Sequence, residues 1–247
     1  TTEIYTLSLH DALPILYAMG KLMRVYDALM DLYGPQGWWP LGPSVRYHRG
    51  EYRQPATPQA VFEVYVGAIL TQNSTWSGAC QAMTRLWALK AMTPRGILAL
   101  ADEVLQEAVR PARYLRQKAG YLRDVSSFYL HLKGRVPSRD ELLAVRGIGK
   151  ETADSILLYA HHVPVFVVDA YTRRILVALG RIGGDEEYDM IRSMFEKELP
   201  GDEIVYNEYH ALLVEHARRY YSRKPYGAGD PLIRKFRTRR VARKDAE

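Results

Sequence analysis

The sequence has very little cysteine and no long apolar run. Its 247 residues include a single cysteine, Cys80. No disulfide can therefore form within the chain, and neither a four-cysteine zinc site nor a four-cysteine iron–sulfur cluster can be built. No apolar run reaches the ~18 residues that a membrane-spanning helix needs. We expect a cytoplasmic protein that has no membrane partner.

The overall composition is that of a folded protein with a basic surface. Hydrophobic residues make up 47% and charged residues 25%, which excludes wholesale disorder. The length suffices for one large domain or two smaller lobes. Thirty-four Lys and Arg against twenty-eight Asp and Glu give a net charge of +6, which favours polyanionic partners.

The segment Thr1–Ile15 (TTEIYTLSLHDALPI) needs separate treatment. It lacks the basic region of a signal peptide, and its proline stands one residue before the end. It resembles the translation of a sequencing-adapter oligonucleotide, so we exclude it from the fold prediction. A natural, frayed N-terminus is the alternative.

Helical periodicity dominates the rest of the chain. Apolar residues recur at steps of three or four along 115–132, which predicts one long amphipathic helix. Thr93-Pro94 has the pattern of a helix start, and Ser138 with Glu141 forms a capping box. Four further helices are expected at Thr152–His161, Ala170–Leu179, Tyr188–Leu199 and Glu203–Tyr221. The apolar run Val163–Val168 is short and has no pairing partner, so we predict an all-α fold.

The most specific pattern is a glycine turn between two predicted helices, Leu142–Ala153. Gly147 and Gly149 flank Ile148, which allows a tight turn that exposes backbone N–H groups at the start of the next helix. Such a turn can bind a phosphate without any side chain. A nucleotide-binding P-loop is excluded, because Ala144 and Glu151 stand where that motif needs glycine and Ser or Thr. A simple helix–helix corner remains the alternative.

A carboxylate follows the apolar run at the start of the next predicted helix. Asp169 can act as the N-cap of that helix, and a helix N-terminus stabilises an ionised carboxylate. The two roles, a structural cap and a functional carboxylate, are compatible.

Positive charge is concentrated near the C-terminus. Arg218–Lys244 contains eleven Lys or Arg and a single acid, Asp230, with aromatic residues interleaved. A surface that follows phosphates fits this pattern. A solvated tail is the alternative.

Together these motifs resemble the helix-hairpin-helix, Gly/Pro-Asp superfamily of DNA glycosylases, in particular its endonuclease III-like members. The resemblance extends from about Gly37 to Leu232 and includes Ile69–Asn73 and Tyr209–Val214. It implies that Asp169 serves catalysis and that Gln72 enters the gap left by a flipped nucleotide. Contacts with double-stranded DNA are expected from Gln72, Asn73, Val145, Gly147, Ile148, Gly149, Lys150, Thr152, Arg218 and Lys224. The resemblance also implies a monovalent cation held by carbonyls of the hairpin.

Two departures from the endonuclease III pattern affect the expected chemistry. The lyase members of the family place a Schiff-base lysine immediately before the Thr-Ala of the hairpin helix, where this chain has Glu151. The iron–sulfur ligands of the family match Tyr221, Gly227, Asp230 and Phe236, none of which is a cysteine. We therefore expect neither a bound cluster nor another cofactor.

The tryptophans narrow the resemblance further. The segment containing Trp38, Trp39 and Pro40, together with Trp76, resembles the 3-methyladenine DNA glycosylase branch, in which aromatic residues line the base pocket. An indole face attracts a cationic alkylated purine by cation–π stacking. Packing of these tryptophans within the protein core is the alternative. We assign Glu151 to the same pocket.

The resulting prediction is a monofunctional DNA glycosylase that acts as a monomer. One helical lobe is expected at 60–163, with the hairpin at 142–153, and a second at 16–59 plus 164–247, with Asp169 in the cleft between them. Asp169 would stabilise the cationic sugar and orient water while the base leaves. The alternatives are a bifunctional glycosylase/lyase and a non-catalytic DNA-binding module.

Overall fold

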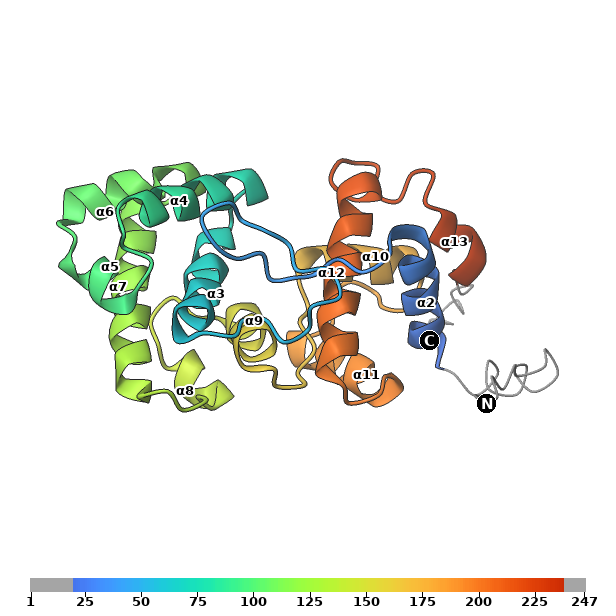
Figure 1. Cartoon of the computed structure of the whole chain (residues 1–247). Helices are drawn as coiled ribbons and strands as arrows, with labels where there is room; N and C mark the ends of the chain where they lie inside the picture. The colour runs from blue at the N-terminus through green and yellow to red at the C-terminus, as the bar shows by residue number, and fades with distance from the viewer. Residues whose placement is uncertain (1–19, 238–247) are drawn as a thin grey trace, which may run out of the picture. The chain divides into compact units, whose positions relative to one another are not determined.

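A computed structural model describes residues 20–237 of the chain (Figure 1). The adapter-like segment 1–15 and the last part of the basic tail lie outside these residues. The described range is all-α, as predicted, and the only β-type pairing within it is an isolated bridge between Leu41 and Arg46. None of its helices has the length and apolar character to cross a membrane.

Most of the helices follow one another with short connections. Their order is α2 (Lys21–Tyr33), α3 (Pro58–Thr71), α4 (Trp76–Ala88), α5 (Pro94–Ala99), α6 (Asp102–Val109), the 3₁₀ turn η1 (Arg110–Ala112), α7 (Leu115–Leu132), α8 (Arg139–Leu143), α9 (Lys150–His161), α10 (Ala170–Ala178), α11 (Tyr188–Glu198), α12 (Glu203–Tyr220) and α13 (Pro231–Phe236). A long loop over residues 34–57 separates α2 from α3.

Local sequence signals account for several of these boundaries. The side chain of Thr93 accepts a hydrogen bond from the Gly96 N–H ahead of α5. Ser138 and Glu141 form the predicted capping box at the start of α8. The expected apolar face of α7 is buried at Leu122 and Val125.

The described residues form two compact units. The hairpin unit consists of Pro35–Asp169 and Gly201–Ala211, and the terminal unit consists of the described parts of Thr1–Gly34, Ala170–Pro200 and Leu212–Glu247. Helix α12 contributes its first part to the hairpin unit and its remainder to the terminal unit.

The loop that precedes α3 belongs to the hairpin unit from Pro35 onward. The sequence analysis had instead assigned residues 16–59 to the other lobe. Buried Glu63 on α3 provides a reason. Its carboxylate accepts hydrogen bonds from the Gly42 N–H at 2.9 Å and from Trp87 Nε1 at 3.0 Å. These bonds tie the loop to α3 and α4.

The core of the hairpin unit is built around α3, which packs against α4, α7 and α9 (Figure 1). Every residue of α3 from Phe62 to Leu70 is buried. Lys118 of α7 is also buried, and its Nζ donates to the Leu70 and Ala112 carbonyls at 2.6 and 2.7 Å. The lysine thereby fixes the end of α3 next to Thr71–Asn73.

Candidate active site and DNA-binding hairpin

The glycine turn joins α8 to α9 as the sequence predicted. Gly147 has a φ of +91°, and a Cβ at this position would lie 2.3 Å from the Tyr121 ring, so the turn requires glycine here. Ile148 is buried, whereas Gly149, Lys150 and Glu151 are exposed.

Gly149 is the N-cap of α9 and brings no side-chain oxygen to its first turn. The first turn of this twelve-residue helix is therefore exposed and has no hydrogen bond from a capping side chain, and its one acidic residue is Glu151. This arrangement suits an anionic group such as a backbone phosphate. The assignment of Glu151 to the base pocket stays a prediction.

An ion pair holds the two helices of the hairpin together. Arg139 of α8 binds the Asp154 carboxylate of α9 through Nε at 2.7 Å and through a terminal nitrogen at 3.1 Å. Asp154 is fully buried, and the Arg139 side chain is 23% exposed. A buried bidentate pair of this kind restricts the angle between two helices.

The structure brings Gln72 directly to the hairpin. Its Nε2 donates to the Gly147 carbonyl at 2.8 Å and to Thr152 Oγ1 at 2.9 Å. The neighbouring Asn73 is exposed, with a φ of +48°. The two motifs that the sequence analysis assigned to DNA are therefore in direct contact within the hairpin unit. Val145 of the hairpin is half-buried, and Thr152 is buried.

Five rings of the hairpin unit form an aromatic cluster, which we define as Trp38, Trp39, Trp76, Tyr159 and His210. Trp38 stacks on Trp76 with a centroid distance of 5.4 Å and an interplanar angle of 19°. Trp39 packs on Tyr159 at 5.2 Å, and Trp38 lies edge-to-face with His210 at 6.0 Å. The three tryptophans that the sequence analysis selected therefore lie in contact with one another.

Exposure separates the three tryptophans into two roles. Trp39 is 5% exposed, and its indole lies against Gly67, where a Cβ would come within 2.7 Å of Nε1. Pro40 is buried as well, whereas Trp38 and Trp76 are partly exposed. Core packing therefore describes Trp39, and the stacked pair keeps aromatic surface available.

Two residues of α12 anchor the loop that carries Trp38 and Trp39. The sequence analysis did not select either of them. The Glu208 carboxylate accepts hydrogen bonds from the N–H groups of Gln36 at 2.7 Å and Gly37 at 3.3 Å. Asn207 Nδ2 donates to the Trp38 carbonyl at 3.1 Å. Gly37 has a φ of +71°, and a Cβ there would collide with the Arg49 backbone. The signal that could have identified Asn207 and Glu208 in the sequence is the occurrence of polar residues on the buried face of a predicted helix.

Asp169 reaches the aromatic cluster through His210. The carboxylate Oδ2 lies 3.9 Å from His210 Nε2, and its side chain is 13% exposed. The other ring nitrogen of His210, Nδ1, lies 2.6 Å from the Tyr159 hydroxyl. His210 lies in the motif Tyr209–Val214, and nothing in the sequence of that motif assigned this residue a role.

Burial controls the protonation of these groups. It lowers the pKa of His210, an effect that the negative charge of Asp169 opposes. It also raises the pKa of Tyr159 well above its usual value, and Glu208 and Asp169 add to the increase. At neutral pH the pair is therefore a neutral imidazole and a protonated phenol.

The terminal unit contains the other predicted DNA contacts. Arg218 and Lys224 are both exposed, and Arg218 lies 3.7 Å from Glu215. An aromatic ring of the basic tail is covered by a cation from another helix of this unit, because the guanidinium carbon of Arg174 in α10 lies 4.5 Å from the centroid of the Tyr226 ring.

The positions that match the iron–sulfur ligands of the family do not fit such a cluster. The Tyr221 hydroxyl donates to Asp230 Oδ2 at 2.5 Å, and His216 Nε2 lies 3.0 Å from Asp230 Oδ1. Asp230 also caps α13 by accepting from the Leu232 N–H. Gly227 has no side chain, and Phe236 has no ligand atom. Buried polar contacts therefore hold this segment together, and residues 20–237 contain no group of metal-binding side chains.

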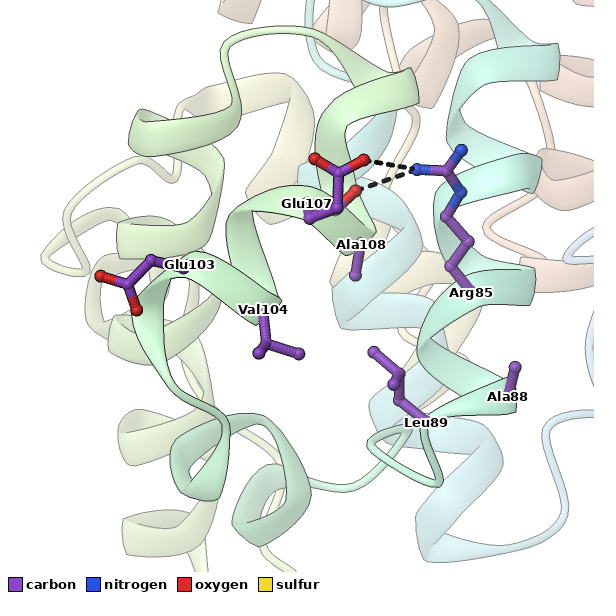
Figure 2. A pocket seen from close by; sticks show the side chains of 7 residues that line it. All are labelled: Arg85, Ala88, Leu89, Glu103, Val104, Glu107 and Ala108. Atoms are coloured by element: carbon purple, nitrogen blue, oxygen red, sulfur yellow. Dashed lines mark hydrogen bonds and ion pairs between the residues drawn. The ribbon is translucent and has the colours of Figure 1, made fainter.

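A separate hollow of about 610 Å³ lies between α4 and α6 (Figure 2). Its lining is Arg85, Ala88, Leu89, Glu103, Val104, Glu107 and Ala108. Arg85 reaches the carbonyl of Glu107 at 3.0 Å and its carboxylate at 3.6 Å. Its walls are aliphatic, its edges carry Arg85 as well as two glutamates, and none of its lining residues belongs to the aromatic cluster.

Comparison with protein families places the motifs in a known context. Residues 66–201 match the model of the family described as HhH-GPD superfamily base excision DNA repair protein. A candidate DNA repair glycosylase of Methanocaldococcus jannaschii is 38% identical over 214 residues, which cover 82% of this chain and 90% of that protein. Endonuclease III of Sulfolobus acidocaldarius is 31% identical over 172 residues, covering 67% of this chain and 76% of the relative.

Solved structures give the same result for the fold. The H. pylori 3-methyladenine DNA glycosylase bound to 1,N6-ethenoadenine superposes with a TM-score of 0.63 at 26% identity, covering 81% of this chain and 98% of that one. A non-covalent endonuclease III–DNA complex superposes with a TM-score of 0.70 at 21% identity, with coverages of 87% and 93%. The second likeness concerns the fold alone.

Proposed function

Since this chain belongs to the HhH-GPD superfamily of base excision DNA repair proteins, we propose that it is a monofunctional DNA glycosylase acting on an alkylated purine. It binds double-stranded DNA as a monomer and hydrolyses the N-glycosidic bond of a flipped nucleotide. Beyond a monovalent cation at the hairpin carbonyls, the proposal requires no cofactor.

The observation that carries this proposal is the connection between Asp169 and the stacked tryptophans. Asp169 lies 3.9 Å from His210, and His210 is in edge-to-face contact with Trp38. A carboxylate therefore lies beside the aromatic cluster within one unit. These are the two groups that the proposed excision of a cationic base uses.

The chemistry follows from where charge develops. As the glycosidic bond breaks, positive charge accumulates on the sugar, and ionised Asp169 stabilises it and orients the attacking water. An alkylated purine carries positive charge before the bond breaks, which makes it a good leaving group. Trp38 and Trp76 favour such a base through cation–π stacking, worth ~0.5–2 kcal/mol.

Binding of the DNA backbone by the hairpin is separate from excision of the base at Asp169. Gly147 and Gly149 present the start of α9 to a phosphate, and Gln72 is held beside them by its bonds to Gly147 and Thr152. This surface fixes the DNA backbone. Removal of the carboxylate should therefore abolish excision and leave DNA binding intact.

The test is a panel of duplexes that each contain one lesion, with chemical identification of the released base. We expect release of an alkylated purine, and a loss of at least about 100-fold in the rate with Asp169→Asn. Asp185→Asn, at an exposed aspartate of the terminal unit, is the matched control. Release that is independent of Asp169 removes this residue from the mechanism, and binding without any release supports a non-catalytic module.

A further inference from the structure

His210 is a buried histidine that uses one ring nitrogen and keeps the other toward Asp169. Its side chain is 6% exposed. Nδ1 lies 2.6 Å from the Tyr159 hydroxyl, while buried Nε2 makes no hydrogen bond to any residue between 20 and 237. A buried polar atom without a partner is costly, and here it points to the carboxylate 3.9 Å away.

The contacts of Tyr159 determine which ring nitrogen carries the proton. The hydroxyl has two acceptors within reach, His210 Nδ1 at 2.6 Å and the Asn207 carbonyl at 3.5 Å. The shorter contact is the better hydrogen bond. When Tyr159 donates to Nδ1, the proton of the neutral imidazole must be on Nε2. The opposite tautomer would direct a nitrogen lone pair at the Asp169 carboxylate.

We propose that His210 is a positioning residue for Asp169, with Tyr159 fixing the tautomer that directs Nε2–H at the carboxylate. This inference rests on the proposed function of Asp169. The distance of 3.9 Å is too long for a hydrogen bond, but contacts of this kind tighten when substrate binds. The Nε2–H group then orients the carboxylate and stabilises its ionised form, and no proton leaves the imidazole.

Several charged or titratable groups surround this contact. The charge of Asp169 acts on His210, and the charges of Glu208 of α12 and Asp169 both act on Tyr159 of α9. Glu208 is occupied with the backbone N–H groups of Gln36 and Gly37. Trp38 closes one edge of the imidazole, so the histidine has little freedom to turn.

The test measures single-turnover base release against pH for four variants. Glutamine is the conservative replacement, since its amide nitrogen can donate to Asp169 from a position close to that of imidazole Nε2. We expect His210→Gln to stay within about threefold of the unmodified protein. We expect His210→Phe to lose about 10-fold to 100-fold, the equivalent of one hydrogen bond to a charged group. The acidic limb of the pH–rate profile of His210→Phe should also move to higher pH, because the Asp169 carboxylate loses a hydrogen-bond donor.

Tyr159→Phe should cause an intermediate loss, because the imidazole can then adopt either tautomer. The same change in a His210→Gln background should cause no further loss, since an amide has no tautomer to select. If the effect of Tyr159→Phe is equal in both backgrounds, tyrosine does not act through the histidine. If His210→Gln is as slow as His210→Phe with an unchanged acidic limb, the role is structural packing. Either result overturns the proposal.

A second measurement does not depend on activity. Nitrogen-15 NMR of labelled histidine distinguishes the two tautomers in the folded protein. We expect the Nε2–H form of His210, and a mixture of forms in Tyr159→Phe. An Nδ1–H form overturns the positioning role, whatever the protein excises. Absence of base release from every lesion together with the Nε2–H form contradicts the proposed function and leaves the tautomer assignment supported.

Discussion

Trp38 and Trp76 stack on each other with ring planes 19° apart and centroids 5.4 Å apart. A base held between two rings needs a contact of about 3.5 Å on each side, which places the rings about 7 Å apart. The pair is too close for a base to lie between its members. A flipped base must therefore part the two rings or stack on the outer face of one of them.

The first prediction concerns this pair. Trp38→Ala or Trp76→Ala should weaken recognition of lesion DNA by ~1–3 kcal/mol, the range for base–aromatic stacking, while affinity for undamaged DNA stays the same. Fluorescence anisotropy with matched duplexes measures both affinities. Trp76→Phe, which retains an aromatic face, should lose less than Trp76→Ala. Unfolding of the alanine variants would instead show that the tryptophans serve the core.

The second prediction concerns the pair between α8 and α9. Arg139→Leu leaves the buried Asp154 carboxylate without its bidentate partner, so the free energy of unfolding should fall by ~3–5 kcal/mol. The neighbouring Arg135–Glu141 pair is exposed on both sides, and Arg135→Leu should cause a much smaller loss. Urea unfolding of the two variants makes the comparison. Equal losses of unfolding free energy in the two variants would show that the buried pair contributes no more to stability than the exposed pair.

The third prediction follows from His161 at the end of α9. Burial, assisted by His162, lowers the pKa of His161 from 6.5 to about 4, and its Nε2 lies 2.6 Å from the Tyr65 hydroxyl. Below pH 6.5 the unfolded chain binds a proton that the folded protein resists, so stability should fall between pH 6.5 and 4.

His161→Gln isolates this contribution because glutamine stays neutral and its oxygen can still accept from Tyr65. The urea midpoint of the variant should decrease less than that of the unmodified protein between pH 7 and pH 5. Parallel decreases in the two proteins would mean that His161 does not titrate with a lowered pKa.

Local signals predicted the helices, whereas the anchoring of the candidate site depends on contacts between distant segments. Ser138 and Glu141 are three residues apart, so their capping box could be predicted from the sequence. Glu208 meets Gln36 from 172 residues away, and Tyr159 meets His210 from 51. Neither pairing has a periodicity or a spacing rule. A buried polar face on a predicted helix was the only hint that Asn207, Glu208 or His210 had distant partners.

The last prediction is that the reaction stops at an intact abasic site. Strand cleavage by a lyase requires an amine that forms an imine with the sugar carbon. The position before Thr152-Ala153 has Glu151 in the first turn of α9, and a carboxylate cannot form an imine. Lys150 precedes it by one residue, and one helical step turns a side chain by about 100°. Gly149 fixes the start of this helix, so Lys150 cannot take the place of its neighbour without a shift of the whole turn.

The measurement uses a duplex with one alkylated purine, analysed with and without alkali after incubation. Strand breaks should appear only after alkali, and borohydride should trap no protein–DNA adduct. Glu151→Lys is the informative variant, because it places an amine at the matching position and should restore some trapping. An adduct formed by the unmodified protein that disappears in Lys150→Ala would contradict the prediction, because it would identify Lys150 as the amine of a bifunctional enzyme.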